Sequence, residues 1–276
     1  MNEERARKFA LTAGIVFTFA TALGPVFYML LTSFSRTPDF LLAGEDYLFT
    51  LENYRTILFA ESVHFLHYLR NSFVVSGISA AVCVFVASLA AYAITRTSLP
   101  GKAFLMFSIL AISMFPPVSL VGYLFKFMTS LGWINTFQAL ILPYVAWSLP
   151  LSLRILVSYF VQVPKDLDKA ALIDGCSRLQ VLFKIIIPVA APGIFSTLLL
   201  AFIFSFNEFL FALMLTTDRA ARTIPVGIAL FEGLHGQIPW GEIMAAASVA
   251  TVPVIVLTLF FQRRIIQGLT RGAVKE

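Results

Sequence analysis

The chain has 276 residues, of which 59% are hydrophobic and only 13% are charged, and its mean hydropathy is +0.86. Soluble domains are about 45–50% apolar and about 25% charged. A soluble enzyme, a disordered chain and a coiled coil are therefore excluded, and an integral membrane protein remains. The net charge of +5 matters less than where the charges lie. The two cysteines, Cys83 and Cys176, provide neither a disulfide framework nor a metal site.

Six apolar stretches are long enough to cross a bilayer as helices, which takes about 20 residues. They cover approximately residues 10–34, 73–95, 103–125, 137–160, 188–215 and 242–262. Each run is continuous rather than alternating, so none is typical of a transmembrane β-strand. The first stretch is too long for a signal peptide and lacks a small-residue cleavage site, so we expect it to be retained. The predicted fold class is all-α, a polytopic membrane protein with six transmembrane helices.

The distribution of Lys and Arg predicts the orientation. With a cytoplasmic N-terminus, the inner segments carry more than twice as many Lys and Arg as the outer ones, so both termini are expected inside. We expect one transmembrane domain, residues 1–276, with four notable extramembrane segments. These are an outer segment (35–72), a cytoplasmic loop (161–184), an outer loop (218–241) and a cytoplasmic tail (263–276).

Two of these features bear on the fold in more detail. Within the outer segment, residues 51–69 are predicted to form an amphipathic helix along the membrane surface. No internal repeat is visible, which disfavours an inverted-repeat transporter within one chain.

The cytoplasmic loop is predicted to contain two helices with a break between them. Asp166 and Asp168 suit a first turn, where the helix dipole favours anions. Gly175 suits the left-handed position after a helix end, and Ser177 can cap a second helix that continues into the fifth span. The first helix has a shallow face at positions i, i+3, i+4 and i+7, formed by Leu167, Ala170, Ala171 and Asp174. Such a face indicates either a surface helix below the bilayer or a helix that fits a groove on a partner.

The same loop resembles the cytoplasmic signature of the membrane subunits of binding-protein-dependent ABC importers. That signature is Glu-Ala-Ala, three residues, Gly, nine residues, Ile, one residue and Leu-Pro. This chain has Lys169-Ala170-Ala171, Gly175, Ile185 and Ile187-Pro188 at the same spacing. Two positions differ: Ile187 replaces Leu, and Lys169 reverses the charge of the family's Glu beside Asp168.

Further segments narrow the resemblance to the carbohydrate branch, and to subunits like the smaller membrane protein of the maltose importer. They lie at residues 51–55, 90–96, 100–102, 206–212, 239–246 and 261–275. The resemblance implies the type I ABC importer permease fold and a location in the inner membrane of a prokaryote.

The resemblance implies three contact regions. The cytoplasmic helix would dock into the ATP-hydrolysing subunit through Asp168, Lys169, Ala170, Ala171, Asp174 and Gly175. The C-terminal tail would reach the same subunit through Gly268, Arg271 and Lys275, with simple positive-inside anchoring as the alternative. The outer loop would enter the sugar-binding protein through Gly233, Leu234, His235, Gly236 and Gln237, with an ordinary surface turn as the alternative.

Polar residues within the spans are candidates for the pathway or a gate. Asn207 and Glu208 lie inside the predicted fifth span, and a carboxylate there is costly and by default functional. They could line the path, lie near its wet outer end or pair with the partner subunit, and a structural or gating role is favoured. Prolines at 116, 117, 143 and 150 are predicted to break spans three and four, and simple kinked packing is favoured over kinks that serve a pathway. Ser119 and Tyr123 lie near these breaks and could line the path.

The expected function is that of a non-catalytic permease subunit of an ABC sugar importer, because the chain has no P-loop and no metal-binding or catalytic cluster. The resemblance implies a heterodimer with a second permease, two ATPase subunits that bind ATP and Mg, and an extracytoplasmic sugar-binding protein. The lipid bilayer is the remaining partner, and nucleic acid is not expected. Trehalose or maltose is the expected sugar, and import of another oligosaccharide or of glycerol phosphate is the alternative. A secondary transporter is disfavoured because only Glu208 and Arg154 are charged in the interior of the spans.

Overall fold

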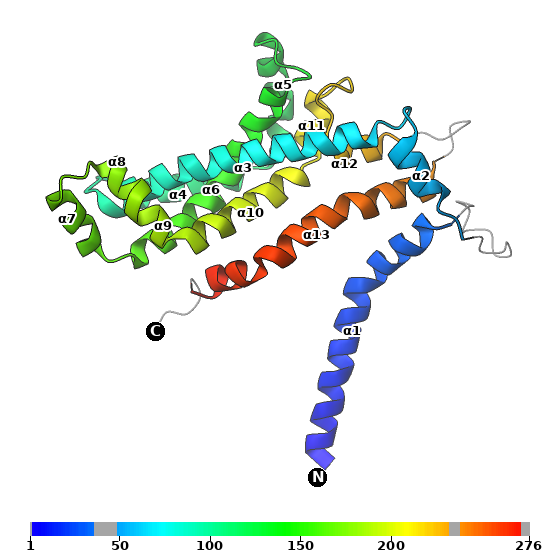
Figure 1. The fold of residues 1–276 in the computed structure, drawn as a ribbon, viewed down its shortest axis with the longest axis horizontal. Coiled ribbons are helices and arrows are strands. Elements are labelled where there is room, and N and C mark those ends of the chain that lie inside the picture. Colours follow the sequence, from blue (N-terminus) through cyan, green and yellow to red (C-terminus); the bar gives the residue numbers. More distant parts are fainter. Residues whose placement is uncertain (1, 36–48, 232–237, 272–276) are drawn as a thin grey trace. The chain divides into compact units, whose positions relative to one another are not determined.

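The computed structural model describes residues 2–35, 49–231 and 238–271 (Figure 1). All regular elements of these residues are helices, which confirms the predicted all-α class. The chain divides into two compact units. Unit 1 comprises Met1–Leu66 and Gly227–Val252, and unit 2 comprises His67–Val226 and Pro253–Glu276.

Four single helices have the length and apolarity needed to cross a membrane. They are α1 (Asn2–Ser33), α3 (Phe65–Arg96), α6 (Phe137–Gln162) and α13 (Trp240–Arg271). Two further candidates are bent pairs of helices. The first joins α4 (Lys102–Ser113) to η1 (Pro117–Leu120) and α5 (Val121–Ser130) at 86°, and the second bends by 85° before α10 (Ala191–Phe206). Counting each bent pair as one span gives the six predicted spans.

In unit 1, α2 (Glu52–Phe59) is fastened to the end of α1. The amide Nδ2 of Asn53 donates to the carbonyl oxygens of Ser33 and Ser35, both at 2.9 Å. The hydroxyls of Tyr54 and Ser33 are hydrogen-bonded at 2.7 Å. Asn53 thus satisfies carbonyls that the end of a helix leaves without partners.

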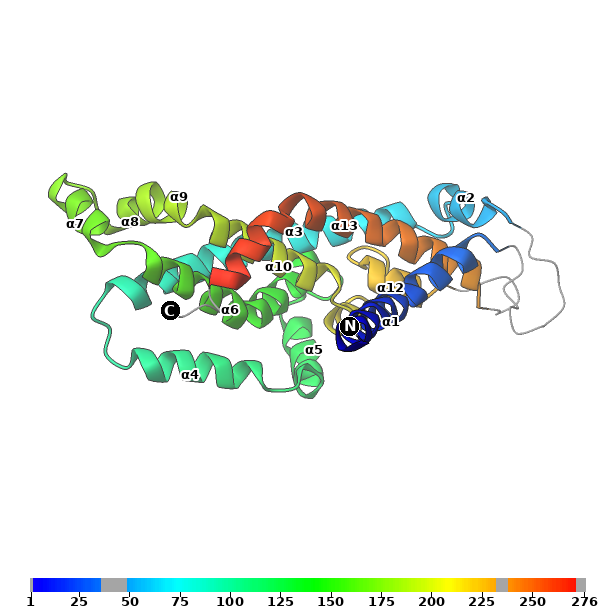
Figure 2. The same ribbon diagram turned by 90° about the horizontal axis from the view of Figure 1, so that it is seen from below.

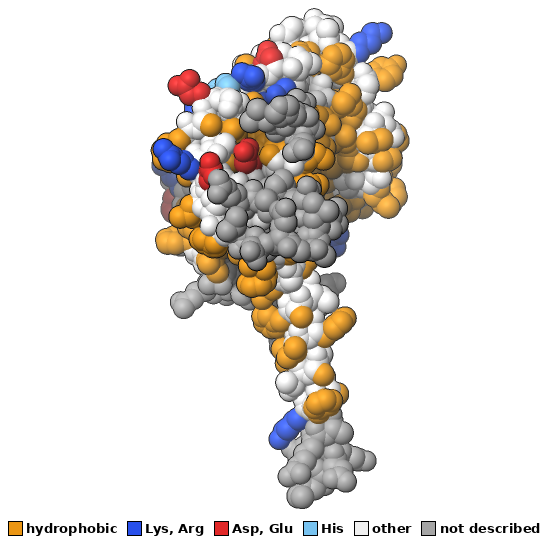
Figure 3. All heavy atoms as spheres, turned by 90° about the vertical axis from the view of Figure 1, so that its right-hand side faces the viewer, with side chains coloured by type: hydrophobic (Ala, Val, Ile, Leu, Met, Phe, Trp, Pro, Cys, Tyr) orange, Lys and Arg blue, Asp and Glu red, His pale blue; other side chains and the backbone are white. Residues whose placement is uncertain are grey.

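The same Asn53 lies against the start of α13. A Cβ atom added at Gly241 would lie 2.5 Å from Nδ2 of Asn53, which is too close for any real side chain. Two segments on which the family resemblance rests, residues 51–55 and 239–246, therefore meet at this one contact. The hydrophobic side chains of α1 are exposed along its length in Figure 3, as expected for a helix surrounded by lipid.

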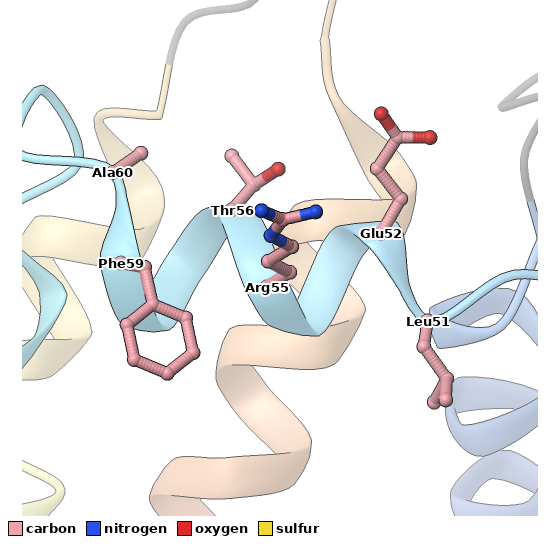
Figure 4. A pocket seen from close by; sticks show the side chains of 6 residues that line it. All are labelled: Leu51, Glu52, Arg55, Thr56, Phe59 and Ala60. Atoms are coloured by element: carbon pink, nitrogen blue, oxygen red, sulfur yellow. The ribbon is translucent and has the colours of Figure 1, made fainter.

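The predicted amphipathic helix over residues 51–69 is wrong in its extent. The helix ends at Phe59, Ala60 is extended, and His64 adopts a left-handed conformation (φ 55°) before α3 begins. The α2 portion is nevertheless two-sided: Leu51 and Phe59 point to one side of the helix, and Glu52 and Thr56 point to the other (Figure 4). The open hollow shown there is bordered by α2 and its two flanking residues alone, so we assign it no function.

In unit 2, α3, α6 and α10 lie side by side (Figures 1 and 2). Gly193 of α10 allows a close approach to the ring of Tyr159 in α6. The thiol of Cys83 in α3 donates to the Ser152 hydroxyl in α6 at 3.3 Å. One hydrophobic core joins these helices near the α7 end of the bundle, and a second core joins α5, α6 and the short α11 (Leu210–Leu215).

The prolines act differently in spans three and four. The break between α4 and η1 at Met114–Pro116 is confirmed. The predicted breaks at Pro143 and Pro150 are wrong, because both prolines lie buried inside the continuous helix α6. A proline removes one backbone donor and introduces a clash, but burial of the helix against its neighbours holds the remaining turns together.

Candidate functional site

The loop between α6 and α10 has the predicted local structure. It contains α7 (Lys165–Ile173), a left-handed Gly175 (φ 87°) and α8 (Arg178–Val181). The Ser177 hydroxyl accepts from the Gln180 amide at 3.3 Å, and the Gln180 side chain accepts from the Ser177 amide at 2.7 Å. This reciprocal capping box starts α8 and confirms the predicted break and cap.

The second helix was expected to continue into the fifth span, but the structure shows that it does not run straight into it. After α8 the chain forms a π-helical segment (Leu182–Ile186) and the short α9 (Ile187–Val189), and then turns by 85° at Ala190. Pro188 and Pro192 both lie close to this turn, and neither can donate the backbone hydrogen bond that would keep a helix straight.

The predicted shallow face of α7 is divided between two sides of the helix. Leu167, Ala170 and Asp174 are exposed, whereas Ala171 is buried in the core together with Val163 and Val181. The prediction that Ala171 belongs to an exposed face is therefore wrong, because this residue anchors α7 to the bundle. Lys169 and Gly175 are exposed, and Asp168 is buried.

Sequence reasoning missed the apolar surface that α7 does present. The side chain of Ile173 is 86% exposed, and Leu172 and Leu179 are also exposed on either side of Gly175. The only signal in the sequence was their position beside the glycine break, where periodicity does not determine which residues face inward.

Sequence reasoning also missed the role of Arg96 at the end of α3. Its Nε lies 2.8 Å from Oδ2 of Asp168, and its Nη2 donates to the Val163 carbonyl at 2.7 Å. The two side chains of the ion pair are only 4% and 11% exposed. The neighbouring Lys169 pairs with Asp166 at 2.9 Å, and their side chains are 72% and 88% exposed. Asp168 and Lys169, both predicted to contact a partner, thus lie in different environments.

Asn207 and Glu208 lie between α10 and α11, so the predicted fifth span is not one continuous helix at this point. Asn207 ends α10, and its Nδ2 donates to the Ile203 carbonyl at 2.8 Å. Glu208 accepts from the backbone amides of Phe211 at 2.8 Å and Ala212 at 3.1 Å. The carboxylate satisfies the free amides in the first turn of α11, so its charge is stabilised within the apolar run.

Two adjoining hollows of about 550 and about 390 Å³ lie beside this break. Asn207 and Glu208 border the first, and Tyr123 borders the second. Trp147 and Phe211 line both, with ring centroids 6.1 Å apart. Ser119 is exposed on η1 and borders neither hollow.

Two predicted contact regions are only partly described. Gly233, Leu234, His235, Gly236 and Gln237 lie outside the described residues, as does Lys275. Gly268 and Arg271 lie in the backbone of α13, which continues to Arg271, well beyond the predicted end of the sixth span. The stretch after residue 262 contains no proline and a single glycine before that end, so the helix is not interrupted. Among the described residues, no group of three or more His, Cys, Asp or Glu is placed to hold a metal ion.

The helical bundle, with several helices of bilayer length and a loop that contains its own helix, places this chain in the class of polytopic membrane proteins. Residues 84–271 match the family model of the binding-protein-dependent transport system inner membrane component, and the chain belongs to this family. It is therefore a multi-pass, non-catalytic permease subunit of an ABC sugar importer in the inner membrane.

Similar permeases agree with this assignment, and a solved structure agrees with the fold. The chain is 51% identical to the trehalose/maltose transport system permease protein MalG of Thermococcus litoralis, over 100% of this chain and 99% of the relative. It is 44% identical to the trehalose transport system permease protein SugB of Mycobacterium tuberculosis, over 82% of each. Its fold is similar to that of a chain from a bacterial ABC transporter that imports the acidic polysaccharide alginate. That match has a TM-score of 0.79 and 18% identity and covers 95% of this chain and 98% of the other.

Proposed function

We propose that α7 is the element through which separate ATPase subunits drive this permease. The observation that carries the proposal is the pair of opposite faces on α7. One face is fixed to the bundle by Ala171 and the Arg96–Asp168 ion pair, and the other presents Ile173 and Leu172 to solvent. An exposed apolar helix face that is held rigidly suits insertion into a groove on a partner. The excess of Lys and Arg on the side of α7 supports a cytoplasmic position for it.

Family membership supports the following proposals for the other subunits. This chain would form half of the pathway together with a second permease in a heterodimer, and two partner subunits would bind ATP and Mg. The outer loop at Gly233–Gln237 would receive the extracytoplasmic binding protein, and the tail at Gly268, Arg271 and Lys275 would lie near the ATPase. The similarity to a trehalose/maltose permease and to a trehalose permease supports trehalose or maltose as the sugar.

Within the pathway, the residues around the α10–α11 break would have two kinds of role. The Glu208 carboxylate accepts hydrogen bonds from two backbone amides and so holds the start of α11, which supports a structural or gating role for it. The aromatic hollow beside Tyr123 and Trp147 would offer flat apolar surface to sugar rings, while Asn207 would offer a hydrogen-bonding amide at its border.

The coupling role is tested in proteoliposomes that contain the complete transporter and the binding protein. Gly175→Leu places a branched side chain at a left-handed position, which costs about 1–2 kcal/mol and should reorient the Ile173 end of α7. Gly132→Leu is the matched control, because Gly132 is also left-handed (φ 68°) and also has open space around it, but lies away from α7. We expect both variants to insert, and only Gly175→Leu to lose sugar uptake driven by ATP. Normal uptake with normal ATP turnover in Gly175→Leu would refute the proposal.

The sugar is tested separately. Competition between labelled trehalose and unlabelled maltose or glycerol phosphate should show strong inhibition by maltose and none by glycerol phosphate. Inhibition by glycerol phosphate alone would reject the disaccharide assignment without affecting the coupling role.

A further inference from the structure

The ion pair between Arg96 and Asp168 joins the last residue of a membrane helix to the first turn of α7. Arg96 uses two of its nitrogen atoms, one toward Asp168 at 2.8 Å and one toward the Val163 carbonyl at 2.7 Å. Val163 immediately precedes the start of the α7 segment, so Arg96 holds that segment at two points. The bond to Val163 is directional and the contact with Asp168 is a close ion pair, so the start of α7 is held to the end of α3 at two points.

The stability of the fold does not by itself explain this pair. Breaking a buried ion pair on one side is costly, but replacing both partners by packed apolar residues is often neutral or stabilising. In the described part of the chain, Nε and Nη1 of Arg96 and Oδ1 of Asp168 are buried without hydrogen-bond partners, so the contact is an ion pair with incomplete hydrogen bonding. A pair that is costly to bury and incompletely hydrogen-bonded adds little to the free energy of unfolding, and its main effect is to fix the position of α7 relative to α3.

The position of the pair indicates what that geometry is used for. The α7 segment is bounded by Pro164 on one side and by the left-handed Gly175 on the other. Without the pair, a force on the exposed face at Ile173 could rotate α7 about these two ends and leave the membrane helices in place. With the pair, the same force acts directly on the end of the 32-residue helix α3.

We propose that Arg96 is a positioning residue for coupling, which makes α7 and the end of α3 move as one body. This inference rests on the proposed contact between α7 and the ATPase subunits. It assigns a role to residues 90–96, which carried part of the family resemblance but no function. The surface pair Lys169–Asp166 on the same helix has no such role, because exposed pairs contribute little and are readily broken.

The test uses the complete transporter in proteoliposomes and measures sugar uptake, ATP hydrolysis and retention of the ATPase subunits. Asp168→Asn should keep the ATPase subunits bound, because the exposed face of α7 is unchanged, but should lower the sugar transported per ATP about fivefold or more. Asp166→Asn is the matched control on the same helix and should transport as the unmodified chain does.

A second variant separates coupling from folding. Arg96→Met combined with Asp168→Leu removes both charges, so no unpaired charge remains buried and the thermal stability should be preserved. Transport per ATP should nevertheless fall as in Asp168→Asn, since the ion pair and the bond to the Val163 carbonyl are lost. Reversing the pair, with Arg96→Asp and Asp168→Arg, should recover part of the coupling.

Either of two outcomes would overturn the inference. One is an Asp168→Asn variant that transports as much sugar per ATP as the unmodified chain, and the other is the same result for the apolar double variant. Ile173→Asp distinguishes this failure from failure of the proposed function. If Ile173→Asp uncouples the transporter while the two pair variants do not, α7 is the contact but Arg96 does not position it. If Ile173→Asp is also without effect, the contact itself is wrong.

Discussion

The close approach of α10 to α6 gives a sharp prediction for Gly193→Ala. The added Cβ would lie 2.4 Å from Cγ of Tyr159 and 2.5 and 2.7 Å from its two Cδ atoms. Carbon atoms in contact are normally about 3.5–4.0 Å apart, so the ring or the helix must move by about 1 Å. Tyr159 is buried in the core that joins α3, α6 and α8, so the ring has little room to move.

The expected cost follows from two opposing effects. Overpacking of a well-packed core lowers the free energy of unfolding by about 1–3 kcal/mol. Replacing glycine by alanine within a helix raises it by about 0.5–1 kcal/mol. We expect Gly193→Ala to lower the free energy of unfolding by about 1–2 kcal/mol, measured by circular dichroism during SDS titration in mixed micelles. Gly77→Ala in α3 is the control, because nothing lies within 4 Å of the added atom, and it should be neutral or slightly stabilising.

A double-mutant cycle identifies the cause. Tyr159→Ala removes the ring and should be strongly destabilising alone, but it also removes the clash. The combined loss in Gly193→Ala with Tyr159→Ala should therefore be smaller than the sum of the single losses by about 1 kcal/mol or more. Strict additivity, or a Gly193→Ala variant as stable as Gly77→Ala, would refute the reasoning.

Two further predictions concern helix caps. Glu208→Ala removes the acceptor for two amides of α11 and should lower the free energy of unfolding by about 1–2 kcal/mol in the same titration, whereas Glu208→Gln should lose less because its amide oxygen still accepts. Unchanged stability in Glu208→Ala would contradict the capping role. Ser177→Ala should cost about 1 kcal/mol and speed amide hydrogen exchange at Gln180, whose amide loses its acceptor. Equal exchange rates in the two proteins would argue against the capping box.

Apolarity and turn chemistry were sufficient to predict the spans and the loop. The spans follow from long apolar runs, and the break after α7 follows from a glycine that accepts a left-handed conformation. Ser177 is predicted as a cap from its residue type and its place after the glycine, and the structure adds Gln180 as its reciprocal partner. These features depend on residues close together in the chain, which is why the sequence alone could predict them.

Features that depend on tertiary contacts could not be predicted. Asp168 and Lys169 are adjacent and both charged, yet one is buried against Arg96 and the other is exposed, because α3 approaches only one side of α7. Glu208 lies in an apolar run that favours a continuous helix, but its carboxylate caps α11 instead. The break before α3 contains no glycine or proline from which it could be predicted, and His64 adopts the left-handed conformation there.

The contact between Asn53 and Gly241 restricts how these two positions can vary during evolution. The Asn53 amide fills the space that any side chain at position 241 would occupy, and the same amide bonds to the carbonyls of Ser33 and Ser35. A side chain at 241 therefore requires the Asn53 amide to move away or a smaller side chain at 53. Either change gives up the bonds to the end of α1, so the two positions are expected to covary.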